Sequence, residues 1–161
     1  MADLTLGIKE SVTVAGQTYT FDTTGSSDDL HISGVNHVFQ QTLDILHTGA
    51  TQVVKFDNTG SPTESAGQIK GTDFKYMRIT NNDSSNFILV ALQDATNNYI
   101  NNYKLLAGQS MYFDTFNFFC IDASVTLGSV KSATTLTGKI EEVLLQADTA
   151  ECSCSIFVAY A

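Results

Sequence analysis

The stretch that decides the fold is residues 74–92, which read FKYMRITNNDSSNFILVAL. Apolar runs at Phe74–Thr80 and Phe87–Leu92 flank six polar turn formers, Asn81–Asn86, and this pattern is typical of two strands joined as a hairpin. In Phe87–Leu92 apolar residues occupy both sets of alternate positions, so the strand has two apolar faces. We therefore predict a β-hairpin whose second strand lies in the centre of a sandwich.

The same period of two extends outward along the chain and predicts further strands. On the N-terminal side, residues 4–14 and 19–21 alternate around a turn at Ala15-Gly16-Gln17, which predicts a first hairpin. On the C-terminal side, Leu105–Phe113 predicts a strand, a glycine turn or bulge, and a second strand. Shorter strands are expected at residues 30–32, 53–56 and 155–160.

Two segments leave the type of element open. Residues 36–46 favour a strand through their β-branched content but also fit a helical turn, and residues 140–147 fit an edge strand or a short helix. The polar segments 22–29 and 57–71 predict loops. Short strands separated by turn signals every roughly 8–12 residues predict an all-β fold, namely an antiparallel β-sandwich of the jelly-roll or Ig-like kind, in a single domain spanning residues 1–161.

Composition narrows the possible partners. The 161 residues include 8 Lys and Arg against 17 Asp and Glu, the net charge is -9, and Arg78 is the only arginine. A nucleic-acid site needs clustered basic residues, so we expect no nucleic acid partner. The longest clear apolar run, Phe87–Leu92, is far shorter than the ~20 residues of a membrane span. Met1–Leu4 lacks the pattern of a secretory signal, so we expect folding in a cytoplasm and no membrane partner.

Three cysteines, Cys120, Cys152 and Cys154, make an odd number. Two positions apart on a strand, Cys152 and Cys154 would lie on one face about 6.6 Å apart, at the far limit of disulfide geometry. Unpaired cysteine is among the most buried residue types. We therefore predict free thiols in the core.

No grouping of side chains predicts catalysis. Ser110 follows a glycine at position 108 but lacks the second glycine that makes a nucleophile elbow. His31, His37 and His47 lack the close pair spacing of metal ligands, so ordinary histidines are favoured. We expect a protein that is not an enzyme and that has no cofactor.

Acidic side chains in the first loop offer one further possibility. Asp22, Asp28 and Asp29 are oxygen ligands of the kind that Ca²⁺ prefers, but they do not match the spacing of an EF-hand. A solvated acidic loop is the favoured interpretation. We therefore predict no metal site.

Aromatic residues gather most densely between positions 112 and 119. The cluster consists of Tyr112, Phe113, Phe116, Phe118 and Phe119. Core packing is the favoured interpretation because buried aromatic rings contribute strongly to stability, and an interface with a partner is the alternative. Arg78, in a predicted strand, is expected to pair with a carboxylate from a neighbouring strand or subunit.

Three parts of the chain together resemble a group of small virion proteins of tailed bacteriophages, many of them phages of marine bacteria. These parts are Leu4–Val12 with Leu30–Asn36, Tyr76–Asn81, and Lys104–Ser110. The group has an opening apolar strand, a Gly-Val/Ile-Asn step, an Arg-Ile/Val-Thr-Asn strand end and a Leu-x-Ala-Gly-Gln/Glu-Ser turn. The resemblance runs to about Phe113, and its motifs are those of strands and turns.

The resemblance implies a β-sandwich component of the virion, made in the bacterial host cytoplasm and assembled onto the particle. A capsid decoration or cement protein is the first choice because the chain lacks a fibrous region. Such a protein binds the major capsid protein and other virion proteins and stabilises the assembled lattice by mass action. Local symmetry favours a homo-oligomer, with a trimer first. Expected contacts are the aromatic cluster and the N-terminal strand residues Leu4, Leu6 and Ile8.

Two alternatives remain open. One is a structural protein of the tail, neck or fibre. The other is a carbohydrate-binding β-sandwich module that uses Tyr99 and Tyr103 with the asparagines around them.

Overall fold

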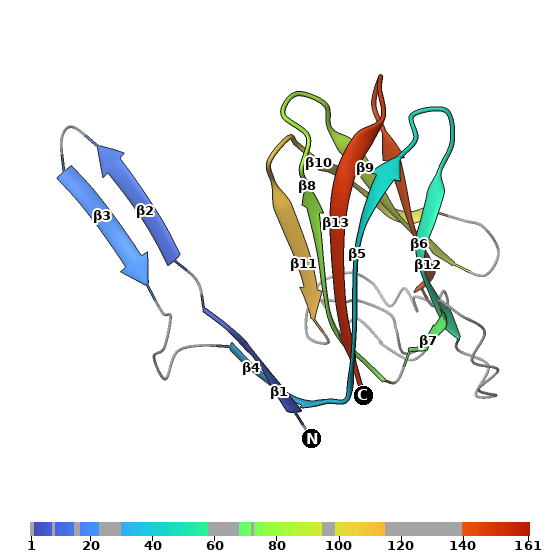
Figure 1. Cartoon of the computed structure of the whole chain (residues 1–161), viewed down its shortest axis with the longest axis horizontal. Helices are drawn as coiled ribbons and strands as arrows, with labels where there is room; N and C mark the ends of the chain where they lie inside the picture. The colour runs from blue at the N-terminus through green and yellow to red at the C-terminus, as the bar shows by residue number, and fades with distance from the viewer. Residues whose placement is uncertain are drawn as a thin grey trace, which may run out of the picture.

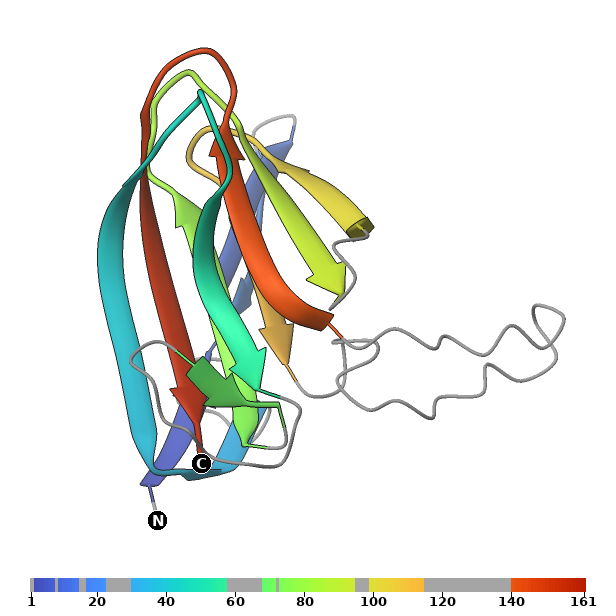
Figure 2. The same cartoon turned by 90° about the vertical axis from the view of Figure 1, so that its right-hand side faces the viewer.

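The computed structural model describes residues 2–7, 9–14, 17–22, 30–57, 68–71, 73–94, 99–114 and 140–161. Every helix or strand in these ranges is a β-strand, and two larger sheets pack face to face (Figure 1, Figure 2). The predicted all-β antiparallel sandwich is confirmed.

The sandwich consists of a five-stranded and a four-stranded sheet. The first has the order β10-β9-β12-β6-β7, with bounds Tyr99–Leu105, Ile88–Asp94, Ile140–Ala147, Thr51–Asp57 and Gln68–Lys70. The second has the order β11-β8-β13-β5, with bounds Ser110–Asp114, Phe74–Asn81, Cys152–Tyr160 and His37–Ile45. Two ribbons precede them, β1 (Ala2–Leu6) with β4 (Leu30–Val35), and β2 (Lys9–Val14) with β3 (Gln17–Asp22). All pairs are antiparallel except β6 with β7.

The strand pairs of the sandwich are nested. β5 pairs with β13, β6 with β12, β8 with β11, and β9 with β10. The chain from β5 to β13 therefore runs as one long hairpin whose tip joins β9 to β10. Two more ladders, β8 with β13 and β9 with β12, roll this hairpin into two sheets. A long hairpin rolled up in this way is a jelly roll, one of the two kinds of sandwich that we predicted.

Because of this winding, the predicted hairpin at residues 74–92 is wrong. β8 and β9 are strands at the predicted positions, but they lie in different sheets, and residues 82–87 carry the chain from one sheet to the other. Each strand has an apolar inner face, and packing these faces together buries both in one core. β9 is a central strand, between β10 and β12, as predicted from its two apolar faces.

The segments with open assignments are also resolved. Within residues 36–46 the structure has the strand β5, His37–Ile45, and no helical turn. Residues 140–147 form the strand β12 and not a helix, but β12 lies between β9 and β6, so the predicted edge position is wrong. Its buried Val143 and Leu145 explain the central position, because they project into the core.

Turn and loop predictions had mixed outcomes. The first hairpin is confirmed as β2 with β3. The turn in Leu105–Phe113 is confirmed too, with Gly108 at a φ of 72°, a conformation that glycine adopts without steric cost. The predicted loop 57–71 contains β7, because Ile69 packs into the core. Residues 23–29 and 58–67 of the predicted loops lie outside the described residues.

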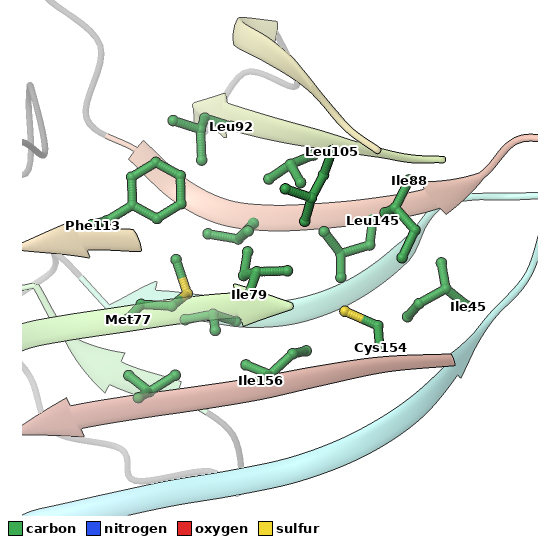
Figure 3. Close-up of a cluster of buried hydrophobic side chains, with 14 of the residues drawn as sticks. Ile45, Met77, Ile79, Ile88, Leu92, Leu105, Phe113, Leu145, Cys154 and Ile156 are labelled. Carbon is green, nitrogen blue, oxygen red and sulfur yellow. The ribbon is translucent and has the colours of Figure 1, made fainter. Parts of the chain in front are cut away.

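The core fills the space between the two sheets (Figure 3). On β13 buried residues alternate with half-buried ones, so that Ile156 and Val158 point inward. Ile79 of β8 lies beside Ile156, and Leu145 of β12 comes from the opposite sheet. Each such side chain contributes roughly 1.5–3 kcal/mol when fully buried.

Two cysteines belong to this core. Cys152 and Cys154 are buried free thiols, which confirms the prediction for these two residues. Burial raises the pKa of the Cys154 thiol to about 12, so it remains protonated near neutral pH and is a poor nucleophile. Cys120 lies outside the described residues.

Asn81 at the end of β8 holds two chain crossings together. Its side chain is fully buried, and Nδ2 donates to the carbonyl oxygens of Asn86 at 2.9 Å and Leu105 at 3.2 Å. Oδ1 accepts a hydrogen bond from the Asp83 backbone N–H at 3.0 Å. The Asn81 carbonyl also accepts from the Gly108 N–H at 3.0 Å. One amide thus satisfies backbone groups of both the β8–β9 and the β10–β11 connections.

We expect Asn81→Ala to lower the free energy of unfolding by about 2–3 kcal/mol, because it leaves buried backbone groups without partners. Asn82→Ala is the matched control. The Asn82 side chain is exposed and donates only to Ser155 Oγ at 2.7 Å, so the control should cost less than about 1 kcal/mol. Denaturant titration of the three proteins measures both values. Equal costs would contradict a special role for Asn81.

Asp83 organises the turn that follows. Its Oδ1 accepts hydrogen bonds from the backbone N–H groups of Asn86 at 2.7 Å and Ser85 at 2.8 Å. These two bonds lower the pKa of the Asp83 carboxyl below its usual value of 3.8. The ionised form is therefore favoured in the folded state.

The stabilisation by Asp83 should depend on pH. Because folding lowers the pKa, the carboxylate contributes stability that is fully present above 3.8 and is lost as the pH falls through the folded-state pKa. The difference in unfolding free energy between the wild type and D83N should therefore shrink towards acid pH. Denaturant titrations at a series of acidic pH values measure this difference. A difference that stays constant with pH would rule out this role for the carboxylate.

The two N-terminal ribbons form what we call the N-terminal arm, β1 to β4. The β1–β4 ribbon lies on the outer face of the four-stranded sheet, where Leu4 and Leu6 pack against a cluster that includes Tyr76. A bulge in this ribbon contains Gly34 at a φ of 75°, opposite the step from Ala2 to Leu4. The β2–β3 hairpin continues away from the sandwich (Figure 1).

Candidate interaction surface

The outer face of the four-stranded sheet carries one row of side chains with the composition of a protein interface. Tyr112 of β11 lies opposite Arg78 of β8, and Arg78 lies opposite Phe157 of β13. Directly opposed residues of antiparallel strands point to the same face, and here that face is away from the core. We call these three residues the Arg78 row. Tyrosine and arginine are enriched among residues that dominate binding at interfaces.

A buried tyrosine holds both rings of the row. Tyr76 stacks on Tyr112 with ring centroids 6.5 Å apart and an interplanar angle of 22°. It also contacts Phe157 edge to face at 6.1 Å. Tyr76 is only 3% exposed, whereas Tyr112 is 53% exposed. The Tyr112 ring is therefore accessible and held in place by a neighbouring buried ring, which lowers the entropy that binding would cost.

The neighbouring row is polar and uncharged. Thr80 and Ser110 share a hydrogen bond between their hydroxyl groups at 2.8 Å, and Thr42 and Ser155 share one at 3.3 Å. Because these side chains are short, they project little from the sheet beside the Arg78 row. Such a surface fits another macromolecule better than a small molecule, which needs a concave site.

Two hollows elsewhere on the described surface are small. One of about 210 Å³ lies over Leu89, Ala91 and Leu144, and another of about 120 Å³ lies beside Phe39 and Val53. Pockets for small molecules usually measure roughly 300–1,000 Å³. These hollows therefore fit single side chains.

Arg78 is the electrostatic feature of the face. It is exposed, and among the described residues no carboxylate forms an ion pair with it. The guanidinium can bind a carboxylate through two parallel hydrogen bonds. The sequence left two sources open for a carboxylate that pairs with Arg78. The described neighbouring strands do not supply this carboxylate, and its supply by another subunit stays a prediction.

The structure separates the predicted contact residues. Tyr112 is exposed, but Phe113, its neighbour on β11, is 5% exposed and belongs to the core. An interface role for Phe113 is therefore wrong, because consecutive strand residues point to opposite faces. Leu4 and Leu6 are half-buried against the protein's own sheet. The remaining candidates, Ile8, Phe116, Phe118 and Phe119, lie outside the described residues.

The sequence analysis missed Phe157 as a member of this surface. The alternation in Cys152–Tyr160 placed it on the same face as Ser153 and Ser155. An aromatic residue on an otherwise polar face was the available signal. Its neighbours Tyr112 of β11 and Arg78 of β8 lie 45 and 79 positions earlier in the chain, so the row exists only in the folded sheet.

Residues considered for metal binding do not gather in the described part of the chain. No group of three or more His, Cys, Asp or Glu side chains there is arranged to hold a metal ion. His37 instead stacks on Tyr160 with ring centroids 5.1 Å apart. Asp28 and Asp29 lie outside the described residues. Among the described residues, no helix has the length and apolar character needed to cross a membrane.

Comparisons with protein-family models, with curated proteins and with solved structures found no match. By its geometry the chain is a jelly-roll domain with a flat face that carries an arginine between two aromatic rings.

We expect substitutions at the three residues Tyr76, Arg78 and Tyr112 to differ sharply in their effect on the free energy of unfolding. Tyr76→Ala should lower the free energy of unfolding by about 3–4 kcal/mol, because the ring is buried. Arg78→Ala should change it by less than about 0.5 kcal/mol, and Tyr112→Ala by less than about 1 kcal/mol. Thermal and denaturant unfolding measure these values. A large loss of stability in Arg78→Ala would identify it as a structural residue instead.

Proposed function

We propose that the protein is a structural component of a bacteriophage virion, a decoration protein that binds the assembled coat lattice. The jelly-roll strand order carries the proposal, because this fold recurs in viral capsid domains. It agrees with the virion proteins that the sequence resembles. Because one fold supports many functions, the proposal also needs surfaces suited to assembly.

The Arg78 row supplies one such surface. A coat subunit that offers a carboxylate beside an apolar patch would bind Arg78 and cover Tyr112 and Phe157. The area buried in this contact exists only when the lattice is assembled, so binding stabilises the assembled shell by mass action. The protein's net charge of -9 makes its single arginine a selective point of attachment.

The N-terminal arm supplies a second surface. Among the described strands, β2 and β3 pair only with each other. A two-stranded hairpin is marginally stable in water unless further strands or packing support it. A neighbouring subunit that packs on the hairpin would provide this support, so the arm suits contacts beyond the sandwich.

A carbohydrate-binding module is the second candidate, because jelly rolls also occur in lectins. Tyr103 is 37% exposed on the edge strand β10, and its ring packs edge to face on Phe113 at 6.2 Å. An exposed aromatic ring that is held in place by a second ring could stack on a sugar. Saturable sugar binding that Tyr103→Ala abolishes would favour this function over the virion proposal.

The copy number in the virion tests the main proposal. Quantitative mass spectrometry of purified particles should find the protein at a level comparable to the major capsid protein. A small, ring-sized number relative to the portal would favour the tail or neck instead. Complete absence from the particle would overturn the virion proposal.

Capsid binding by variants tests the surface. Recombinant protein is mixed with particles that lack it, and the bound fraction is measured by co-sedimentation. We expect Arg78→Ala to weaken binding by at least about tenfold, the usual effect of losing a buried charged contact. Gln52→Ala, an exposed change on the five-stranded sheet, is the control and should bind like the wild type. Unchanged binding of Arg78→Ala would exclude the Arg78 row as the contact.

A further inference from the structure

The strand β5 forms an open edge of the four-stranded sheet. Among the described strands it pairs only with β13, so one side of its backbone is available for hydrogen bonding. β5 has nine residues, which corresponds to roughly 30 Å of strand. A long open edge of this kind is a template for pairing with another strand.

The edges of the five-stranded sheet are protected in ways that β5 is not. β10 carries Lys104, and β7 has only three residues and ends at Lys70. Lysines and short strands are the usual means of blocking edge pairing. β5 has no lysine, arginine or proline, and its only carboxylate is Asp44. β11, the other edge of the four-stranded sheet, also lacks these residues but is only five residues long, so β5 is the longest described edge without such protection.

Side chains on both faces of β5 are unusually exposed. Phe39, on the inner face, is 36% exposed, and Val38, on the outer face, is 56% exposed. Phe39 lines the groove of about 120 Å³ together with Val53, Ile69 and Tyr160. Apolar groups are therefore left open along the same edge as the backbone hydrogen-bonding groups.

We infer that β5 pairs antiparallel with β5 of a second copy of this chain, about a two-fold axis at Gln41. In a regular antiparallel pair, the β5 residues whose N–H groups point away from β13 must lie opposite the same kind of residue in the second copy. Opposed side chains must also lie on the same face of the joined sheet. Symmetric registers that satisfy both conditions are centred on a residue. The register centred on Gln41 engages all nine residues of each strand.

In this register the two strands complement each other. Phe39 of each copy lies opposite Leu43 of the other, so the exposed Phe39 ring meets a half-buried apolar side chain on the inner face. Gln40 lies opposite Thr42, and Asp44 lies opposite Val38. No like charges are opposed along the seam. The pair forms roughly 8–10 backbone hydrogen bonds, and it joins the two four-stranded sheets into one of eight strands.

This contact has two consequences for assembly. Its two-fold symmetry produces a dimer, whereas the sequence led us to expect a trimer. It also places the Arg78 rows of both copies on one continuous outer face. If the proposed capsid function holds, the two rows bind in concert and raise the overall affinity. The dimer itself does not depend on that function.

Charge substitutions at Gln41 test the seam, because the axis brings the two Gln41 side chains directly together. Gln41→Lys and Gln41→Glu each place like charges opposite each other, so the Kd of the dimer should rise by at least about tenfold in both variants. An equimolar mixture of the two variants should form a heterodimer, because the charges then attract. Sedimentation velocity across a concentration series measures all three.

Gln52→Lys and Gln52→Glu are the matched controls, since Gln52 is exposed on the other sheet. They should dimerise like the wild type. Circular dichroism and thermal unfolding check that every variant is folded. A wild type that is monomeric at its highest soluble concentration would overturn the inference, and so would an oligomer that both Gln41 variants leave intact. Loss of self-association in both variants without rescue in the mixture would overturn the proposed register.

Discussion

The ladder between β8 and β13 is the interaction on which the rest of the structure depends. Every other pair within the four-stranded sheet joins strands that a simple long hairpin would also join. The β8–β13 ladder instead brings the last described strand against β8, the fourth strand of the sandwich in chain order. It aligns Ile79 with Ile156 and Met77 with Val158 on the inner face, and all four are fully buried. The matching β9–β12 ladder rolls the other half, so that two sheets enclose one core.

Rolling the hairpin puts most consecutive strands into opposite sheets, and at each such step the chain must cross the end of the core. Crossing segments leave backbone groups without ladder partners, which is costly in a buried position. Asn81 and Asp83 satisfy several of these groups at the β8–β9 crossing, and Asn81 also satisfies the Leu105 carbonyl at the β10–β11 crossing. The polar residues that suggested a tight hairpin turn in the sequence therefore have another purpose, namely to cap two strands of different sheets.

The same winding decides which surfaces are open. The β1–β4 ribbon covers one end of the outer face of the four-stranded sheet, where Phe157 is half-buried, and leaves Arg78 and Tyr112 of the Arg78 row exposed. β5, as the first strand of the roll, has β13 on one side and no described strand on the other. Both proposed contacts, one with a coat subunit and one with a second copy, thus use the same sheet. They use different parts of it, the outer face and the edge, so the two can form together.

The sequence by itself determined the class of fold, because period-two alternation is a local property that each strand expresses wherever it pairs. The sequence also predicted the positions of β8, β9, β11 and β13, the turn at Gly108 and the buried thiols at positions 152 and 154. The partners of the strands did not, since β5 and β13 are opposite ends of the sandwich and their pairing depends on long-range closure of the roll. Only the tertiary structure could therefore separate buried Phe113 from exposed Tyr112, or bring Arg78 between two rings. Those distinctions depend on which face of a strand another sheet happens to cover.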